Sequence, residues 1–189
     1  TMQCNKNGNA SLFNALMNID LNAYDTLVVG PGIGIDSDDW QKSKDYLLGF
    51  KGLLILDADA LNRISESKLG SKFFLERESK TWITPHSKEF AKLFPNTKCE
   101  SNVERAFNAA KEFNISVLLK GANSIVADNK KAWQLFGTDS QTARAGLGDL
   151  LSGFVAGSAA IDLTFCGNIT TDFFAKYVLL HCLLYTSPS

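Results

Sequence analysis

Short apolar runs alternate along this chain with longer segments of helical periodicity. The apolar runs have the length of buried strands and occupy residues 27–29, 53–56, 82–83 and 116–119. Between them, residues 38–49 predict a helix with Gly49 as a candidate C-cap. A capping box at residues 101–104 opens a second helix, which presents an apolar stripe of Val103, Phe107, Ala110 and Phe113.

Beyond residue 119 the pattern changes to paired strands and then to apolar helices. Residues 124–127 and 131–135 predict two strands joined by a turn at 128–129. Apolar helices are predicted at 150–161 and 173–180. Strands that alternate with helices favour a mostly parallel sheet with helices on both faces. We therefore predict one α/β domain, since no repeat or linker divides the chain.

Composition and charge exclude several classes of protein. The chain has 189 residues, 45% of them hydrophobic, and a formal net charge of −1. That charge argues against nucleic acid as the main partner, because such binding depends on neutralising phosphates. We expect no membrane span, because no stretch of about 18 apolar residues is free of polar interruption. The four cysteines include no CxxC pair, so neither a zinc site nor a disulfide framework is indicated, and we expect a cytoplasmic protein.

Chemistry-bearing residues follow each of the four apolar runs. In an open α/β sheet, ligands bind beyond the carboxyl ends of the strands. The segments at those places are 30–34 (Gly-Pro-Gly-Ile-Gly), 57–62 (starting Asp-Ala-Asp), 84–89 (Thr-Pro-His-Ser-Lys-Glu) and 120–121 (Lys-Gly). Together they indicate a ligand site at this edge of the sheet.

Each of these segments also has a purely structural interpretation. The glycines at 30 and 32 fit an ordinary tight turn. Asp57 or Asp59 fits the N-cap of the following helix. His86 could be a half-buried imidazole with its hydrogen bonds satisfied, and Lys120 a solvated lysine.

The segment Gly146-Leu147-Gly148-Asp149 is the most specific of all. Two glycines directly before a helix leave successive N–H groups free to converge on an anion. Asp149 then lies beside that anion, where a carboxylate could act as the general base in phosphoryl transfer. The alternative is that Asp149 is an ordinary helix cap.

These motifs together resemble the ADP/ATP-dependent NAD(P)H-hydrate dehydratases of the ribokinase-like superfamily. The resemblance runs from about residue 26 to residue 181. It implies a ribokinase-like α/β fold and a lyase that repairs hydrated NADH or NADPH. ADP or ATP would phosphorylate the ring hydroxyl, and phosphate elimination would restore the ring.

The resemblance also implies roles for individual residues. Asp149 would be the catalytic base, and Gly146 and Gly148 the anion hole. Lys120 and Gly121 would line the nucleotide-phosphate region. The hydrated dinucleotide would contact Gly32, Asp57, His86 and Glu89. Mg²⁺ would accompany the phosphates, held mainly by phosphate and water rather than by protein ligands.

The sequence departs from the family pattern in places. Ser87 and Lys88 replace the usual Pro-Gly, and Ala145 replaces a glycine before the anion hole. We expect the domain to lack its first strands, to span residues 1–181, and to be followed at 182–189 by a non-native tail. The family also suggests oligomer formation and a fused or separate epimerase domain.

Two other functions fit the same fold. A kinase acting on a thiamin-precursor alcohol would share the loop before Asp149, although the segments at 57–59 and 85–89 favour the dehydratase. A non-catalytic nucleotide-binding homologue would be expected to lose Asp149, which is present here.

Overall fold

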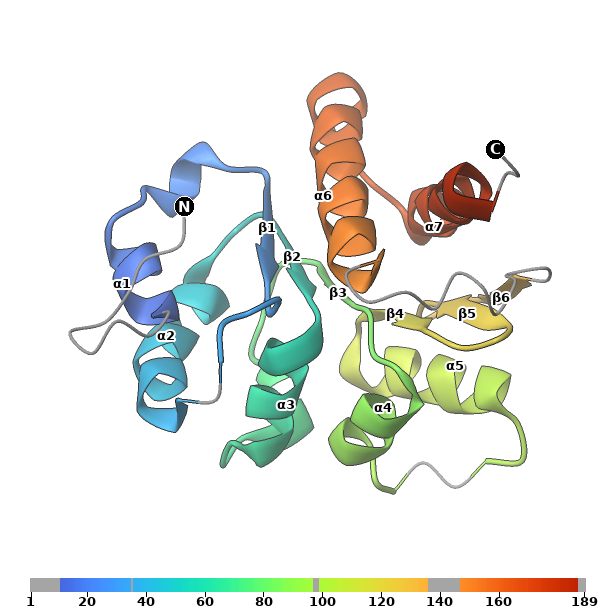
Figure 1. Cartoon of the computed structure of the whole chain (residues 1–189), viewed down its shortest axis with the longest axis horizontal. Helices are drawn as coiled ribbons and strands as arrows, with labels where there is room; N and C mark the ends of the chain where they lie inside the picture. Colours follow the sequence, from blue (N-terminus) through green and yellow to red (C-terminus); the bar gives the residue numbers. More distant parts are fainter. Residues whose placement is uncertain (1–10, 35, 97–98, 136–146, 187–189) are drawn as a thin grey trace.

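One six-stranded sheet organises the part of the chain that the computed structural model describes, residues 11–34, 36–96, 99–135 and 147–186. The strands lie in sequence order across the sheet (Figure 1): β1 (Thr26–Val29), β2 (Leu53–Leu56), β3 (Thr81–Ile83), β4 (Ser116–Leu119), β5 (Ser124–Ala127) and β6 (Ala132–Leu135). Strands β1 to β4 pair in parallel, whereas β5 and β6 are antiparallel. The mostly parallel sheet predicted from the sequence is confirmed.

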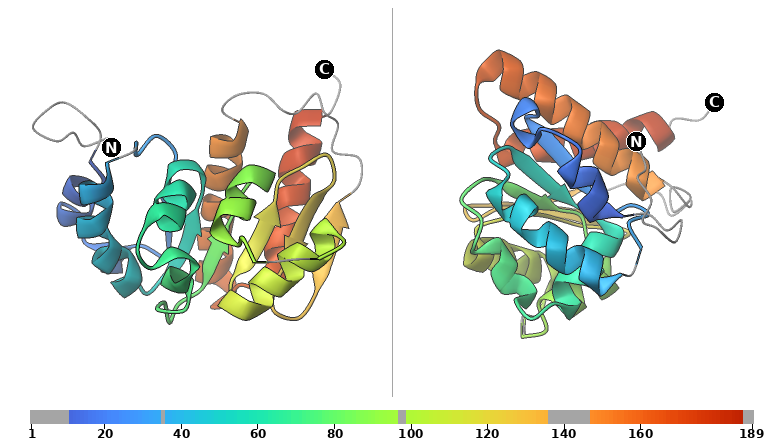
Figure 2. Two further views of the ribbon diagram at one scale, coloured as in Figure 1. Left: turned by 90° about the horizontal axis from the view of Figure 1, so that it is seen from below. Right: turned by 90° about the vertical axis from the view of Figure 1, so that its left-hand side faces the viewer.

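Helices cover both faces of this sheet, so the molecule has three layers (Figure 2). One face carries α1 (Leu12–Met17), α2 (Ser37–Gly49), α3 (Ala58–Glu66), α4 (Ser87–Leu93) and α5 (Asn102–Phe113). The opposite face carries α6 (Leu147–Cys166) and α7 (Thr171–Thr186). Two short 3₁₀ helices, η1 (Leu21–Ala23) and η2 (Gly70–Phe74), complete the described elements.

The alternation of side chains along each strand divides the core into two clusters. On β2, Leu54 and Leu56 face the layer of α1 to α5, whereas Leu53 and Ile55 face α6 and α7. On β3, Trp82 faces α7 and stacks on Phe174, with ring centroids 4.3 Å apart and planes 8° from parallel. Both faces of the central strands are thus buried, which explains their uninterrupted apolar sequences.

The helix boundaries agree with the sequence analysis at some places and differ at others. Ser101 caps α5 and accepts a hydrogen bond from the Glu104 N–H, as predicted. The prediction for Gly49 was wrong, because Gly49 is the last residue of α2 and Phe50 is the C-cap. Helix α7 continues to Thr186. The division of the chain at residue 181 stays a prediction.

Helix α6 bears on the expected absence of a membrane span. Between Gly148 and Cys166 it is long and apolar enough to cross a membrane, although polar residues interrupt its sequence. In the structure, 28% of this segment is buried, and Leu151, Val155 and Ala159 pack against the sheet. A single such helix is weak evidence for a span, since the core helices of soluble proteins can be equally long and apolar.

Candidate functional site

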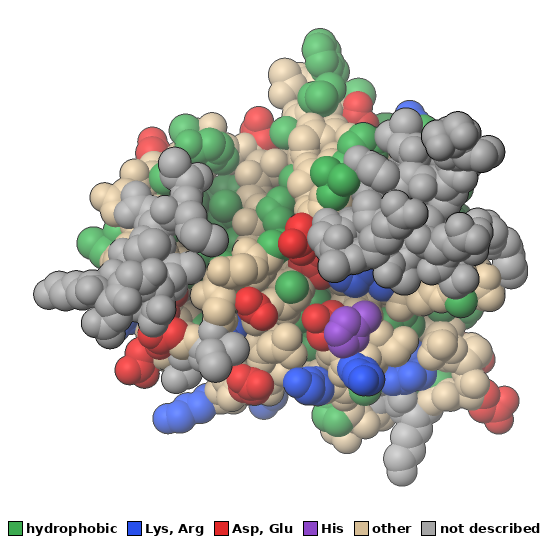
Figure 3. Space-filling model, viewed as in Figure 1, with side chains coloured by type: hydrophobic (Ala, Val, Ile, Leu, Met, Phe, Trp, Pro, Cys, Tyr) green, Lys and Arg blue, Asp and Glu red, His purple; other side chains and the backbone are tan. Residues whose placement is uncertain are grey.

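The carboxyl ends of β1 to β4 bring the predicted site residues to one edge of the sheet. Gly30 follows β1, Asp57 follows β2, and the start of α6 at Gly148 lies against the latter. His86 and Lys120 lie side by side on the extensions of β3 and β4, where they form an isolated parallel bridge. On the face shown in Figure 3, acidic side chains, basic side chains and a histidine lie together near the centre. The parallel strand order therefore assembles a polar site from distant segments.

Asp57 is buried and binds three donors. Its Oδ1 accepts hydrogen bonds from the Ala58 N–H and the Lys120 ammonium, both at 2.8 Å. Its Oδ2 accepts a hydrogen bond from the Ser152 hydroxyl at 2.7 Å. The side chain is 2% exposed, so the ionised carboxylate is stable there only because it is paired and hydrogen-bonded. Asp57 is also the N-cap of α3, which confirms the structural interpretation, while the predicted contact with substrate stays a prediction.

Lys120 lies between this carboxylate and the first turn of α6. A Cβ built on Gly148 would lie 3.6 Å from the Lys120 Nζ and 3.9 Å from the Asp57 Oδ2. The lysine side chain is 27% exposed, so the ammonium is held by Asp57 without being sealed from solvent. The Lys120 N–H donates to the Pro85 carbonyl at 2.8 Å, which fixes the backbone of the extension. An ammonium group thus stands beside the N–H groups at the start of α6, with Gly121 directly after it.

The conformation of the glycine loop after β1 is fixed by contacts with residues 57–63. Gly30 has φ +140°, and a Cβ there would lie 1.7 Å from the Asp57 carbonyl oxygen, so no other residue fits. Gly32 has nothing within 4 Å of its Cβ position and lies exposed. The Asp59 carboxylate accepts the Gly34 N–H at 3.0 Å, and the Arg63 guanidinium donates to the Gly34 carbonyl. At Gly30 the close neighbour is the backbone of Asp57, directly after β2, and the predicted contact of Gly32 with substrate stays a prediction.

His86 caps α4 through its imidazole. Its Nδ1 accepts hydrogen bonds from the N–H groups of Lys88 and Glu89, at 3.1 and 3.2 Å. In return, Glu89 Oε2 accepts the His86 N–H at 2.8 Å, which completes a capping box. Because Nδ1 is an acceptor, the neutral ring carries its proton on Nε2, which lies 3.5 Å from Glu89 Oε1. The imidazole therefore offers a donor at this edge, and Glu89 is buried as its structural partner.

Asp149 lies in the first turn of α6 with an exposed side chain. Two residues separate it from the predicted anion-hole position Gly146, which lies outside the described residues together with Ala145. Gly148 itself is half-buried next to Lys120. The described part of the loop thus brings a carboxylate, an ammonium and backbone N–H groups to the same helix start.

Two site residues escaped the sequence analysis. Ser152 is fully buried one turn after Gly148, where it donates to Asp57. Thr84 is also fully buried, and its hydroxyl has no hydrogen-bond partner among the described residues. The alternation of side chains could have indicated both positions. Thr84 stands two residues beyond Trp82, which faces the layer of α6 and α7, and Ser152 lies one helical turn after Gly148.

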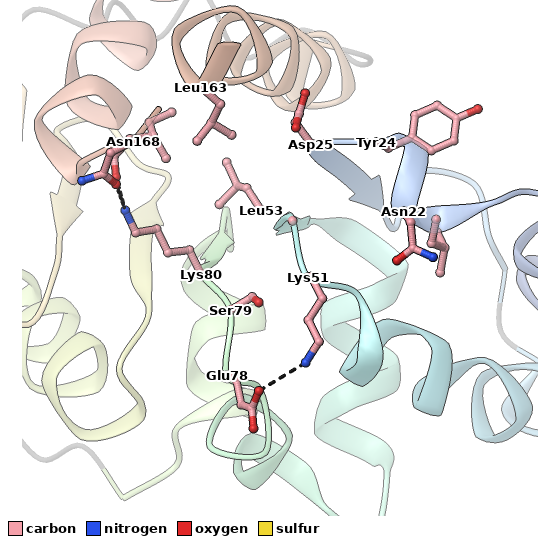
Figure 4. A pocket seen from close by; sticks show the side chains of 13 residues that line it. Asn22, Tyr24, Asp25, Lys51, Leu53, Glu78, Ser79, Lys80, Leu163 and Asn168 are labelled. Atoms are coloured by element: carbon pink, nitrogen blue, oxygen red, sulfur yellow. Dashed lines mark hydrogen bonds and ion pairs between the residues drawn. The ribbon is translucent and has the colours of Figure 1, made fainter. Parts of the chain in front are cut away.

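A separate cavity of about 480 Å³ lies at the opposite edge of the sheet, at the amino ends of the strands (Figure 4). There Lys51 pairs with Glu78 at 3.2 Å, and the Lys80 ammonium donates to Asn168 at 2.7 Å. Burial lowers the pKa of Lys80. The first contact joins the segments before β2 and β3, and the second joins the start of β3 to the turn between α6 and α7. None of the predicted site residues lines this cavity.

The described residues contain no group of three or more His, Cys, Asp or Glu side chains that could hold a metal ion. Asp149 is the acidic side chain in the first turn of α6, and it is exposed. A magnesium ion at this edge would accordingly depend on ligands from a bound phosphate and water.

Comparisons with known proteins identify the family of this chain. The family model described as NAD(P)H-hydrate dehydratase matches residues 4–171. A bifunctional NAD(P)H-hydrate repair enzyme from Methanopyrus kandleri is 35% identical over 147 residues, which cover 75% of this chain and 28% of that relative. The chain therefore spans little more than a quarter of the length of this curated relative.

Solved structures show the same fold. An ADP/ATP-dependent NAD(P)H-hydrate dehydratase from Bacillus subtilis, co-crystallized with ATP/Mg²⁺ and soaked with CoA, gives a TM-score of 0.64 at 22% identity, covering 90% of this chain and 58% of that one. A ribokinase-like superfamily protein from Enterococcus faecalis gives 0.70 at 22% identity, covering 91% and 56%. The predicted ribokinase-like α/β fold is confirmed. By the match to the family model, this chain belongs to the NAD(P)H-hydrate dehydratase family.

Proposed function

We propose that the protein carrying this chain dehydrates hydrated NADH or NADPH with ADP or ATP as the phosphoryl donor. One observation carries the proposal: the Lys120 ammonium lies 3.6 Å from the Cβ position of Gly148, and Asp149 follows Gly148 directly in the first turn of α6. A base and a cation at a helix N-terminus suit the transfer of a phosphoryl group to a hydroxyl.

In this reaction Asp149 takes the proton of the ring hydroxyl as its oxygen bonds to the terminal phosphorus of the nucleotide. The nucleotide leaves with one phosphoryl group fewer. The ring C–O bond then breaks and releases phosphate, while the neighbouring carbon loses a proton and the ring double bond returns. Lys120 and the N–H groups at Gly148 balance the charge on the phosphoryl oxygens, and Gly146 and Gly121 extend that contact.

The hydrated dinucleotide would bind at the same edge of the sheet, near the loops that follow β1 and β3. Gly32 offers open space there, and His86 offers its Nε2–H as a donor, held in place by Glu89. Mg²⁺, held mainly by phosphate and water, would supply charge neutralisation there. The solved B. subtilis relative was co-crystallized with ATP/Mg²⁺, which supports this choice of co-reactants.

The setting of the whole protein is part of the same proposal. Relatives such as the M. kandleri enzyme are named bifunctional, so we infer a partner activity that epimerises the same damaged cofactor, fused or separate. A cytoplasmic location, where the nicotinamide cofactors are used, and assembly into a homo-oligomer also belong to this proposal.

The test is recovery of the reduced-nicotinamide absorbance from hydrated NADH. Recovery should require ADP or ATP, and Asp149→Asn should lower turnover about 10²- to 10⁴-fold, as expected on loss of a general base. Asp172→Asn removes an exposed acid that pairs with Lys131 on the same side of the sheet and should leave turnover unchanged. Phosphorylation of a thiamin-precursor alcohol without any such recovery would favour the kinase, and nucleotide binding without either reaction would favour a non-catalytic homologue.

A further inference from the structure

Asp57 is a buried carboxylate at this edge of the sheet, and its side chain is only 2% exposed to solvent. A carboxylate without solvent contact is costly unless its charge is matched, and here the match is the Lys120 ammonium at 2.8 Å. The two residues lie 63 positions apart, at the ends of strands β2 and β4, which are separated by β3. The pair therefore spans a strand and fixes where the ammonium can stand.

The second oxygen of Asp57 is also occupied. Ser152, fully buried in α6, donates to Oδ2 at 2.7 Å, so the same carboxylate is tied to the helix whose first turn carries Asp149. With the Ala58 N–H on Oδ1, three donors leave Asp57 one fixed orientation. The ammonium of Lys120 thereby acquires a fixed position relative to Gly148.

We propose that Asp57 is a positioning residue that holds the Lys120 ammonium, and through Ser152 the start of α6, in the geometry needed for phosphoryl transfer. The inference rests on the proposed function and assigns Asp57 a role through Lys120 in place of direct contact with the substrate. The ammonium lies 3.6 Å from the Cβ position of Gly148, at the helix start where the proposed reaction places the transferring phosphoryl group.

The Asp57→Asn variant tests whether Asp57 positions the Lys120 ammonium or whether the ammonium acts only by attracting the nucleotide phosphates. The amide has nearly the same shape but removes the negative charge that anchors Lys120. Removing a negative charge near a phosphate does not weaken nucleotide binding by itself, whereas a mobile ammonium orients the transferring group poorly. We therefore expect kcat to fall about tenfold or more, while the KM for nucleotide changes less.

A double-mutant cycle tests whether Asp57 acts through Lys120. In a Lys120→Met background, Asp57→Asn should change kcat less than about threefold, because the group that it positions is absent. Equal effects in both backgrounds would indicate a general structural role and overturn the proposal. Glu78→Gln removes an exposed ion pair at the other edge of the sheet and serves as the control that should not change kcat.

A second measurement does not depend on turnover. The Lys120 ammonium should give a slowly exchanging ¹⁵N signal, identified by its loss in Lys120→Met, which disappears in Asp57→Asn and persists in Glu78→Gln. Persistence of that signal in Asp57→Asn would refute the positioning role, as would its absence from the wild type. If Asp57→Asn does not fold, Ser152→Ala should lower kcat only when Lys120 is present, and an equal loss in both backgrounds would refute the idea.

These results distinguish two kinds of failure. A wild-type protein that does not dehydrate hydrated NADH with ADP or ATP contradicts the proposed function, while the ammonium signal still tests the geometry around Asp57. A wild-type protein that is active but gives an additive cycle contradicts only the positioning role.

Discussion

Among glycine-to-alanine substitutions at the candidate site, Gly30→Ala should lower the free energy of unfolding most. Gly30 lies at the end of β1 with φ +140°, a conformation that L side chains rarely adopt. The new Cβ would also stand 1.7 Å from the Asp57 carbonyl oxygen, whereas real Cβ atoms essentially never come within 3.0 Å of another atom. Since the Asp57 N–H donates to the Val29 carbonyl, relieving the clash disturbs the pairing of β1 with β2.

The expected magnitude combines two costs. Backbone strain at such a φ costs about 1–3 kcal/mol for a non-glycine residue. Overpacking against neighbours that must shift costs about 1–3 kcal/mol more. We therefore expect a loss of about 4 kcal/mol, a large share of the roughly 5–15 kcal/mol that stabilises a typical domain.

Denaturant unfolding followed by tryptophan fluorescence and circular dichroism measures this loss, with two matched glycines as controls. Gly32→Ala, in the same loop, meets nothing within 4 Å and adds only strain from φ +68°, so we expect a loss of about 1–2 kcal/mol. Gly49→Ala, in α2 and also without neighbours, should stabilise the protein by about 0.5–1 kcal/mol. Equal losses for the alanines at 30 and 32 would refute the reasoning.

Three further predictions concern polar groups. Thr84→Val removes a buried hydroxyl without a partner among the described residues, so the free energy of unfolding should stay the same or rise by up to about 1 kcal/mol, and a larger loss would reveal a hidden partner. His86→Asn can still cap α4, whereas His86→Ala should cost about 1 kcal/mol; equal stabilities would argue against the cap. Burial, together with a hydrogen bond to Asp162, raises the pKa of Tyr177 above its usual 10.0. Because the folded state then holds this proton more tightly, the stabilisation is complete below pH 10 and declines above it. Comparing the pH dependence of unfolding with that of Tyr177→Phe, which lacks the proton, should reveal this decline only in the wild type.

Much of the fold could be predicted from the sequence, because the spacing of apolar residues that marks a strand or a helix is a local property. The apolar runs at 53–56 and 116–119 coincide with β2 and β4, and the predicted antiparallel pair coincides with β5 and β6. The helix ends were predicted less exactly, since a C-cap at Gly49 or one residue later, at Phe50, changes little in the local pattern. The roles predicted for Asp149 and Gly148 came from the glycines that precede a helix and from the family resemblance, and not from periodicity.

The sequence alone determined which residues follow each strand and, through the alternation of side chains, which face each of them takes. Asp57 and Lys120 stand two residues beyond Ile55 and Leu118, so strand phase alone places both on the α6 side. Only the tertiary structure decided that they pair with each other across β3, and that Ser152, 95 residues from Asp57, completes the contact. Period-two alternation fixes a direction for each side chain, but partners so far apart are chosen by strand order and by the packing of α6 against the sheet.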